Sequence, residues 1–199
     1  QPRSRGLGDV YKRQGGFVLV CSPGWSYSED TVVRYNISVH DGINSGRVIH
    51  FGGGGNRTVF SNNTIVLSSK QQLPLLECTE WDGGRARGTR FINNLILIEP
   101  GGEGRYVLGT SEVPIFTENW LMGSHKGLPK GVVTTAEMPP LRGPWPLDLS
   151  GDVVRALTPI NGRDFPRGQR LPDHSLRDYL GNPVPADRQP CLGAIEQQP

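Results

Sequence analysis

The side chains best suited to chemistry are concentrated between Glu77 and Arg87, in the sequence ECTEWDGGRAR. Two carboxylates that flank a glycosidic bond can act as general acid and base, so Glu80 and Asp82 fit the needs of a hydrolase. A Trp ring offers a flat apolar surface on which a sugar can stack, which makes Trp81 a candidate. A solvated Gly-rich loop with ordinary charges has the same composition, and that alternative stays open.

Further candidates for this region are Arg85 and two residues from earlier in the chain. His50 lies in the apolar stretch RVIHF, and Trp25 lies in a turn-like segment. A His, Lys or Arg can abstract the proton α to a uronic carboxylate, so His50 or Arg85 fits the base of a lyase. The sequence leaves open whether His50 points outward or is a partly buried structural residue. The pair His40 and Asp41, and also His125, lie in turn-like contexts and are predicted to be exposed.

A repeat must position these residues. Four segments align without gaps, and one column is Asn in all of them, at positions 36, 63, 94 and 119 (Asn36, Asn63, Asn94 and Asn119). Subtraction gives spacings of 27, 31 and 25 residues. An apolar residue stands three positions before and three positions after each Asn. Self-similarity at such a period predicts a solenoid, and the alternative is chance alignment in an Asn-rich β-sandwich.

Each Asn is predicted to mark a corner between two short strands. A coil of this length must hold several strands and turns, which leaves little room for one straight strand of nine residues. Asn also tolerates the left-handed backbone region better than most residues do. Stacked corners would let the four Asn side chains hydrogen-bond to one another as an internal ladder. One further apolar strand per coil is expected at 17–21, 47–51, 73–78 and 105–109.

The composition agrees with short strands joined by many turns. The 199 residues include 27 Gly and 17 Pro, and the formal net charge is +2. A charge so close to balance indicates neither nucleic acid nor an anionic membrane as a partner. The chain has no apolar run of about 18 residues, so no membrane-spanning segment is predicted. The cysteines lack zinc-site spacing, no metal site is predicted, and Cys21, Cys78 and Cys191 are interpreted as core or near-core thiols.

Three regions are predicted. Residues 1–14 (QPRSRGLGDVYKRQ) resemble translated adapter read-through, so they are interpreted as non-native and set aside from the fold, with the native N-terminus expected further upstream. Residues 15–140 are predicted to form the coils. Residues 141–199 are rich in Pro, Gly and Arg and are predicted to form an irregular C-terminal cap over the last coil.

The repeats TVVRYNIS, FSNNTI and FINNLI resemble those of right-handed parallel β-helix proteins with pectate-lyase-like architecture, many of them secreted bacterial carbohydrate-active proteins. The tail is similar to the closing segment of such chains, at 157–162 (LTPING), at 178–185 (DYLGNPVP) and at Gly193, Ala194 and Glu196. The resemblance implies an all-β fold, a right-handed parallel β-helix. The same scaffold carries lyases, hydrolases and purely structural repeats, so the fold does not choose among activities.

The resemblance implies that this is the C-terminal part of an exported protein, secreted, periplasmic or on the cell surface, that binds or degrades a polysaccharide. The alternative is a non-catalytic module whose catalytic part lies upstream. No cofactor is expected, except that a lyase can require a divalent cation such as calcium. The full-length protein is expected to be a monomer. Substrate-binding residues are expected at Trp81, Trp25, Glu77 and Arg87, and catalytic residues among Glu80, Asp82, His50 and Arg85.

Overall fold

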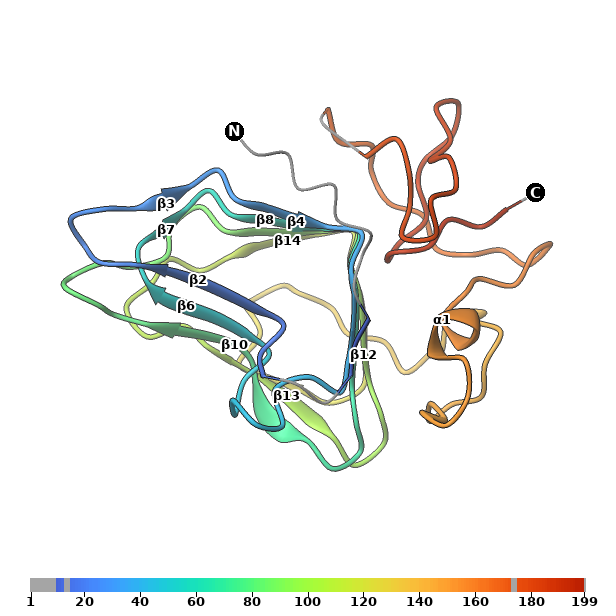
Figure 1. The fold of residues 1–199 in the computed structure, drawn as a ribbon, viewed down its shortest axis with the longest axis horizontal. Coiled ribbons are helices and arrows are strands. Elements are labelled where there is room, and N and C mark those ends of the chain that lie inside the picture. The colour runs from blue at the N-terminus through green and yellow to red at the C-terminus, as the bar shows by residue number, and fades with distance from the viewer. Residues whose placement is uncertain (1–9, 13–14, 173–174, 199) are drawn as a thin grey trace.

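The computed structural model describes residues 10–12, 15–172 and 175–198, and these form a parallel β-solenoid of about four turns followed by an irregular tail (Figure 1). Short strands recur in the same order in each coil. Each pairs in parallel with the equivalent strand of the neighbouring coil. The predicted all-β parallel β-helix is therefore confirmed.

Three stacks of strands form the walls of the solenoid, and a two-stranded sheet lies between the first two walls. Sheet 1 contains β2 (Val18–Ser22), β6 (Ile49–Gly53), β10 (Gln72–Thr79), β13 (Glu103–Val107) and β16 (His125–Lys126). Sheet 2 contains β4 (Val32–Arg34), β8 (Val59–Ser61), β11 (Arg90–Ile92) and β14 (Ile115–Thr117). Sheet 3 contains β1 (Val10–Lys12), β5 (Ile37–Val39), β9 (Thr64–Leu67), β12 (Leu95–Ile98) and β15 (Trp120–Met122). The small sheet pairs β3 (Ser28–Glu29) with β7 (Gly55–Asn56).

The core lies inside the coils, where equivalent apolar residues stack along the axis. Phe60, Phe91 and Phe116 occupy the position three residues before the Asn column. Their rings stack with centroid separations of 4.8 Å for the first pair and 4.7 Å for the second. Because each ring buries its faces against the neighbouring coils, the repeat is stable only as a stack.

The Asn column forms a ladder at the corner between sheets 2 and 3. The side-chain amide nitrogen of each of the first three Asn residues donates to the Oδ1 of the Asn in the next coil, at 3.0 Å, 3.0 Å and 2.9 Å along the series. The left-handed residue is not the ladder Asn, as the sequence predicts, but the residue before it: Tyr35, Asn62, Asn93 and Glu118, with φ between 51° and 58°. The backbone turns at that residue, which leaves the ladder Asn free to point into the corner.

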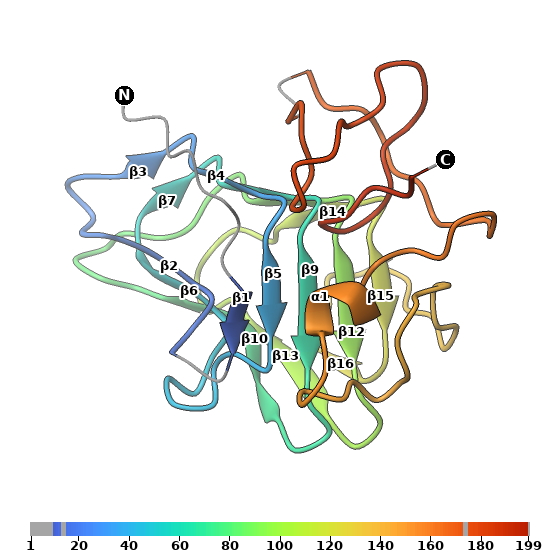
Figure 2. The same ribbon diagram turned by 45° about the vertical axis from the view of Figure 1, so that its right-hand side comes forward.

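The tail packs against the outer face of sheet 3, whereas the sequence predicts that it packs over the last coil. Every residue of β5, β9 and β12 is buried, so these strands are covered on both faces. Leu147, Phe165 and Ile195 of the tail join the apolar cluster that contains outward-facing residues of these strands. Figure 2 shows the tail, with the short helix α1 (Val153–Ala156), in front of sheet 3. A strand that is apolar at every position needs a layer on each face.

The ends of the solenoid differ in detail from the predicted boundaries. The last strand, β16, ends at Lys126, and residues 127–140 run irregularly before the predicted cap. Val10–Lys12 form β1, which pairs with β5, so this part of the segment set aside as adapter-derived adjoins sheet 3. The origin of that segment stays a prediction. Within the described residues, no helix has the length and apolar character needed to cross a membrane.

Several side chains differ in burial from the predictions. His40 and Asp41 are buried, not exposed, because the turn that carries them is covered by the tail and by the following turn. His125 is half-buried beside Tyr106, with Nδ1 at 3.1 Å from the Tyr hydroxyl. Cys21 is exposed on sheet 1, whereas Cys78 and Cys191 are buried, and all three are free thiols.

Candidate functional site

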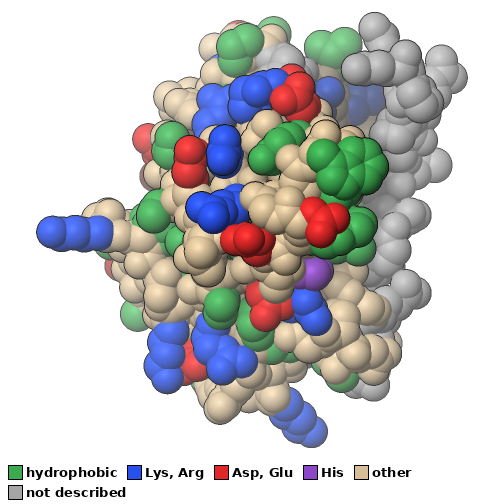
Figure 3. All heavy atoms as spheres, turned by 90° about the vertical axis from the view of Figure 1, so that its left-hand side faces the viewer, with side chains coloured by type: hydrophobic (Ala, Val, Ile, Leu, Met, Phe, Trp, Pro, Cys, Tyr) green, Lys and Arg blue, Asp and Glu red, His purple; other side chains and the backbone are tan. Residues whose placement is uncertain are grey.

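The predicted site residues lie at or beside the edge where the chain leaves sheet 1 and turns towards sheet 2. We call this the turn edge, and it comprises residues 22–30, 52–57 and 79–88. It lies on the left of Figure 1 and faces the viewer in Figure 3. Figure 3 shows side chains of both charges interspersed with exposed apolar groups on this face, without a single-signed patch. Such a mixed surface suits a ligand that has both polar and apolar groups along its length.

A tight turn presents Trp81 and Asp82 to solvent. Trp81 and Gly84 form an antiparallel bridge, and the Gly84 amide donates to the Trp81 carbonyl at 2.8 Å. The two residues between them have φ values of 47° for Asp82 and 72° for Gly83. Two successive positive φ values are typical of a type I′ turn, for which Asp-Gly is a preferred pair. The local sequence therefore fixes the turn that exposes the Trp ring.

Two turns from different coils touch each other and bring Trp25 and Trp81 to the same edge. A Cβ atom added to Gly24 would lie 1.8 Å from the Asp82 carbonyl oxygen and 2.7 Å from the Gly84 nitrogen. Between them in the stack lies the Gly52–Gly55 run, which has no side chains to hold the turns apart. Trp25 is 80% exposed and Trp81 is 47% exposed. The glycines therefore create a place where two exposed Trp side chains come from adjoining turns.

We expect Gly24→Ala to disrupt this contact. Because the atoms in the way belong to the backbone, the two turns must separate, at a cost of about 1–3 kcal/mol in the free energy of unfolding. The measurement is urea unfolding together with the tryptophan emission maximum, which should shift. Gly15→Ala is the matched control, since an added Cβ there meets nothing within 4 Å. Equal, small effects of the two substitutions would contradict the contact.

A polar cluster lies beside the turn edge on the outer face of sheet 1. Arg47 Nη1 lies 2.8 Å from Glu77 Oε2 and 3.2 Å from His50 Nε2. His50 Nε2 also lies 3.0 Å from the hydroxyl of Thr79. Partial burial, and after it the positive charge of Arg47, lower the pKa of His50, against the opposing effect of Glu77. The imidazole is therefore neutral at pH 7, and Nε2 accepts a hydrogen bond from the guanidinium.

A second polar group lies on the turn edge itself. Arg85 Nε lies 3.3 Å from Glu80 Oε2, and the Thr110 hydroxyl donates to the same oxygen at 3.1 Å. Glu80 is therefore held by one cation and one hydroxyl. Arg87 also lies on the turn edge, where its backbone extends the β3–β7 sheet through a bridge to Asn56. The structure thus places two of the predicted residues, His50 and Glu77, on adjacent strands of sheet 1. The other six lie on the turn edge: Trp25, Glu80, Trp81, Asp82, Arg85 and Arg87.

Sequence reasoning missed three polar partners: Arg47, Thr79 and Thr110. Each contacts a predicted residue from a neighbouring strand or turn, and the separations His50 to Thr79 and Glu80 to Thr110 are 29 and 30 residues. These separations equal about one coil. Aligning the sheet 1 strands in register, in addition to the Asn column, would have identified both threonines.

A cavity lies away from this site. It lies where the strands of sheet 3 end. One side is formed by the turns that follow β5, β9 and β12, and the other side is formed by the tail residues Leu147–Ser150. Among the described residues, no group of three or more His, Cys, Asp or Glu side chains is arranged to hold a metal ion. The turn edge is thus an exposed surface of aromatic and paired charged groups.

Comparison of the chain with protein-family models, with curated proteins and with solved structures finds no match, so inferences about function rest on the residues described above.

Proposed function

We propose that this chain binds a polysaccharide across the turn edge and the outer face of sheet 1, as the C-terminal part of an exported protein of pectate-lyase-like architecture. One observation carries the proposal: Trp25 and Trp81 are both exposed, on turns that are in backbone contact. Exposed apolar side chains that gather at one place on a surface are typical of binding sites. Two at one edge match the alternating apolar faces of successive sugar rings.

The polar groups around the two Trp rings support the same proposal. Arg47 with Glu77, and Arg85 with Glu80, present donors and acceptors that are already oriented by ion pairs. Sugar hydroxyls can both donate and accept, so they can bridge such pairs without a large loss of solvation. An extended chain lying across the stack would meet equivalent groups on successive coils, at the spacing of about 4.8 Å between neighbouring strands.

The test is retention of the full chain in gels that contain neutral or uronic polysaccharides. We expect Trp25→Ala and Trp81→Ala each to weaken binding about 2- to 12-fold, because each removes one stacking surface worth about 0.5–1.5 kcal/mol. The double variant is expected to abolish retention. Leu176→Ala is the matched control, since Leu176 is also highly exposed but lies on the tail. Unchanged retention of the double variant on every polymer that binds the parent protein would refute the proposal.

A second candidate function is β-elimination of a uronic polysaccharide, and the His50 cluster favours it. A neutral imidazole beside a guanidinium is the pair that such a reaction uses, one to take the α proton and the other to neutralise the uronate carboxylate. The test follows the ultraviolet absorbance of the unsaturated product with uronic polymers. Absorbance that grows with the parent protein and not with His50→Gln supports catalysis. Binding without any absorbance gain or new reducing ends supports the non-catalytic module.

A further inference from the structure

The cavity between the turns after β5, β9 and β12 and the tail lies away from the turn edge. It has a volume of about 870 Å³ and is bounded by His40, Asn44, residues 68–71, Glu99 and residues 147–150. This volume falls in the usual range of small-molecule sites, about 300–1,000 Å³. The cavity also lies where two separate structural units meet, which is a common location for such sites.

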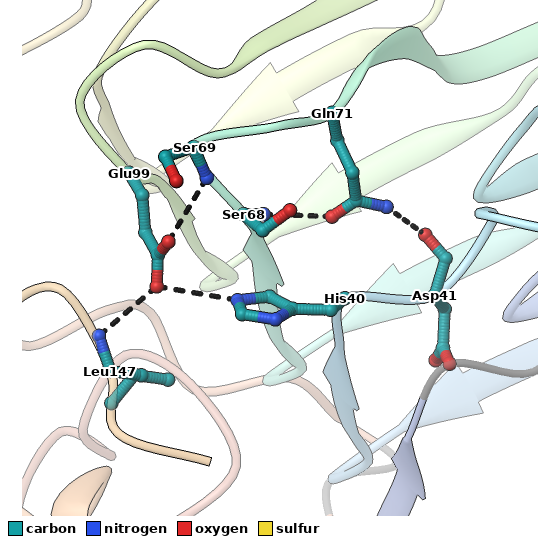
Figure 4. A network of polar contacts seen from close by, with 7 residues as sticks. All are labelled: His40, Asp41, Ser68, Ser69, Gln71, Glu99 and Leu147. Atoms are coloured by element: carbon teal, nitrogen blue, oxygen red, sulfur yellow. Dashed lines mark hydrogen bonds and ion pairs between the residues drawn. The ribbon is translucent and has the colours of Figure 1, made fainter.

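The floor of the cavity is a buried polar network (Figure 4). Glu99 Oε1 lies 3.3 Å from His40 Nε2 and accepts the Leu147 amide at 3.0 Å, while Oε2 accepts the Ser69 amide at 3.0 Å. Gln71 accepts the Ser68 amide and donates to the Asp41 carbonyl, both at 2.7 Å. His40, Gln71 and Glu99 are each more than nine-tenths buried. Hydrogen bonds between separate segments of the chain therefore hold the floor together.

The rim carries groups of mixed polarity from both units. From the solenoid come Ser68, Ser69 and the exposed Lys70, and from the tail come Asp148 and Ser150. Hydrogen bonds from Ser150 lower the pKa of Asp148, so this carboxylate is ionised at neutral pH. One cation and one anion thus stand on the two sides of the cavity. Ile43, which is half exposed, and Leu149 add apolar surface between them.

We propose that this cavity is a binding site for a short neutral saccharide, separate from the turn edge and independent of its function. The balanced rim charges disfavour an anionic or a cationic ligand, since each would meet one like charge. Hydroxyls that both donate and accept suit the serines, Lys70 and Asp148 together. The apolar side chains suit the C–H face of a sugar ring, and the volume accommodates a ligand of disaccharide size.

The test titrates the full chain with cellobiose and maltose as neutral probes and with digalacturonate as an anionic one, by calorimetry and by NMR. We expect a neutral probe to bind, with the largest amide shifts at residues 68–71 and 147–150. Lys70→Met should weaken binding about tenfold, because it removes a charged donor while it keeps the apolar stem. Lys126→Met, on β16, is the matched control and should bind as the parent protein does.

The outcomes separate this site from the turn edge. Cellobiose or maltose binding that is weakened by Lys70→Met and kept in the Trp25→Ala, Trp81→Ala double variant supports the cavity. Binding that is lost in the double Trp variant and kept in Lys70→Met assigns the probe to the turn edge and overturns the inference. So does tighter binding of digalacturonate, or no binding of either neutral probe at tens of millimolar.

Discussion

Asn94→Ala is expected to lower the free energy of unfolding by about 3–5 kcal/mol, more than any surface substitution in this chain. Asn94 is completely buried, and its side chain makes four hydrogen bonds. Its Oδ1 accepts the backbone and side-chain amides of Asn63, and its Nδ2 donates to the Phe60 carbonyl and to Asn119 Oδ1. Ala supplies none of these partners, and the groups left behind are buried away from water.

The control for this prediction is the first member of the same ladder. Asn36 is only partly buried, and its side-chain amide nitrogen donates to Asn63 Oδ1 and to the Arg34 carbonyl. We expect Asn36→Ala to cost about 1 kcal/mol, because water can replace the lost contacts. Urea unfolding of both variants measures the difference. Similar losses for the two would mean that the ladder contributes through local turn geometry, not through its buried hydrogen bonds.

The Asn ladder was predictable because the aligned Asn column is visible in the sequence itself. Four aligned Asn residues with apolar neighbours require a common environment, and a parallel stack is the arrangement in which identical residues meet. The backbone conformation at the corner was not predictable in the same way. Tyr35, Asn62, Asn93 and Glu118 share a positive φ but not a residue type, so this column carries no sequence signal.

The position of the tail could have been inferred from the strands it covers. Thr64–Leu67 (TIVL) and Leu95–Ile98 (LILI) lack the alternation of a half-exposed strand, and this indicates that both faces are covered. The sequence could not predict which segment covers them, because the tail has no regular period. Its contacts, such as Asn62 Nδ2 to the Cys191 carbonyl, join residues that are 129 positions apart.

The sequence predicted which residues belong to the candidate site but not how they are arranged in space. The composition of 77–87 identified an exposed aromatic and charged turn, and the structure has that turn. The role of the glycines at 24 and 52–55 emerges only when the coils are stacked, because each is close to a neighbour roughly one or two coils away. The pairing of Glu99 with His40 was missed for a related reason: the two residues are 59 positions apart, about two coils, and neither belongs to a repeated column.

That pairing leads to the second large prediction. Glu99→Ala is expected to lower the free energy of unfolding by about 3–5 kcal/mol, the usual cost of removing one member of a buried, hydrogen-bonded charged network. The single carboxylate satisfies three donors from three segments: His40, Ser69 and Leu147. Glu103→Ala is the matched control, since Glu103 pairs with the largely exposed Lys126 and such pairs contribute about 0–1 kcal/mol.

The same substitution should act first on the tail, because Glu99 is the side chain that joins the Leu147 amide to the solenoid. Hydrogen exchange is therefore expected to accelerate at Leu147 and its neighbours well before it does in β9 or β12, whose amides are held by parallel partners on both sides. Limited proteolysis should likewise cut between residues 141 and 150 in Glu99→Ala and not in Glu103→Ala. If the tail keeps its protection while the strands lose theirs, the carboxylate stabilises the coil turns alone, and the tail is held by its apolar contacts with sheet 3.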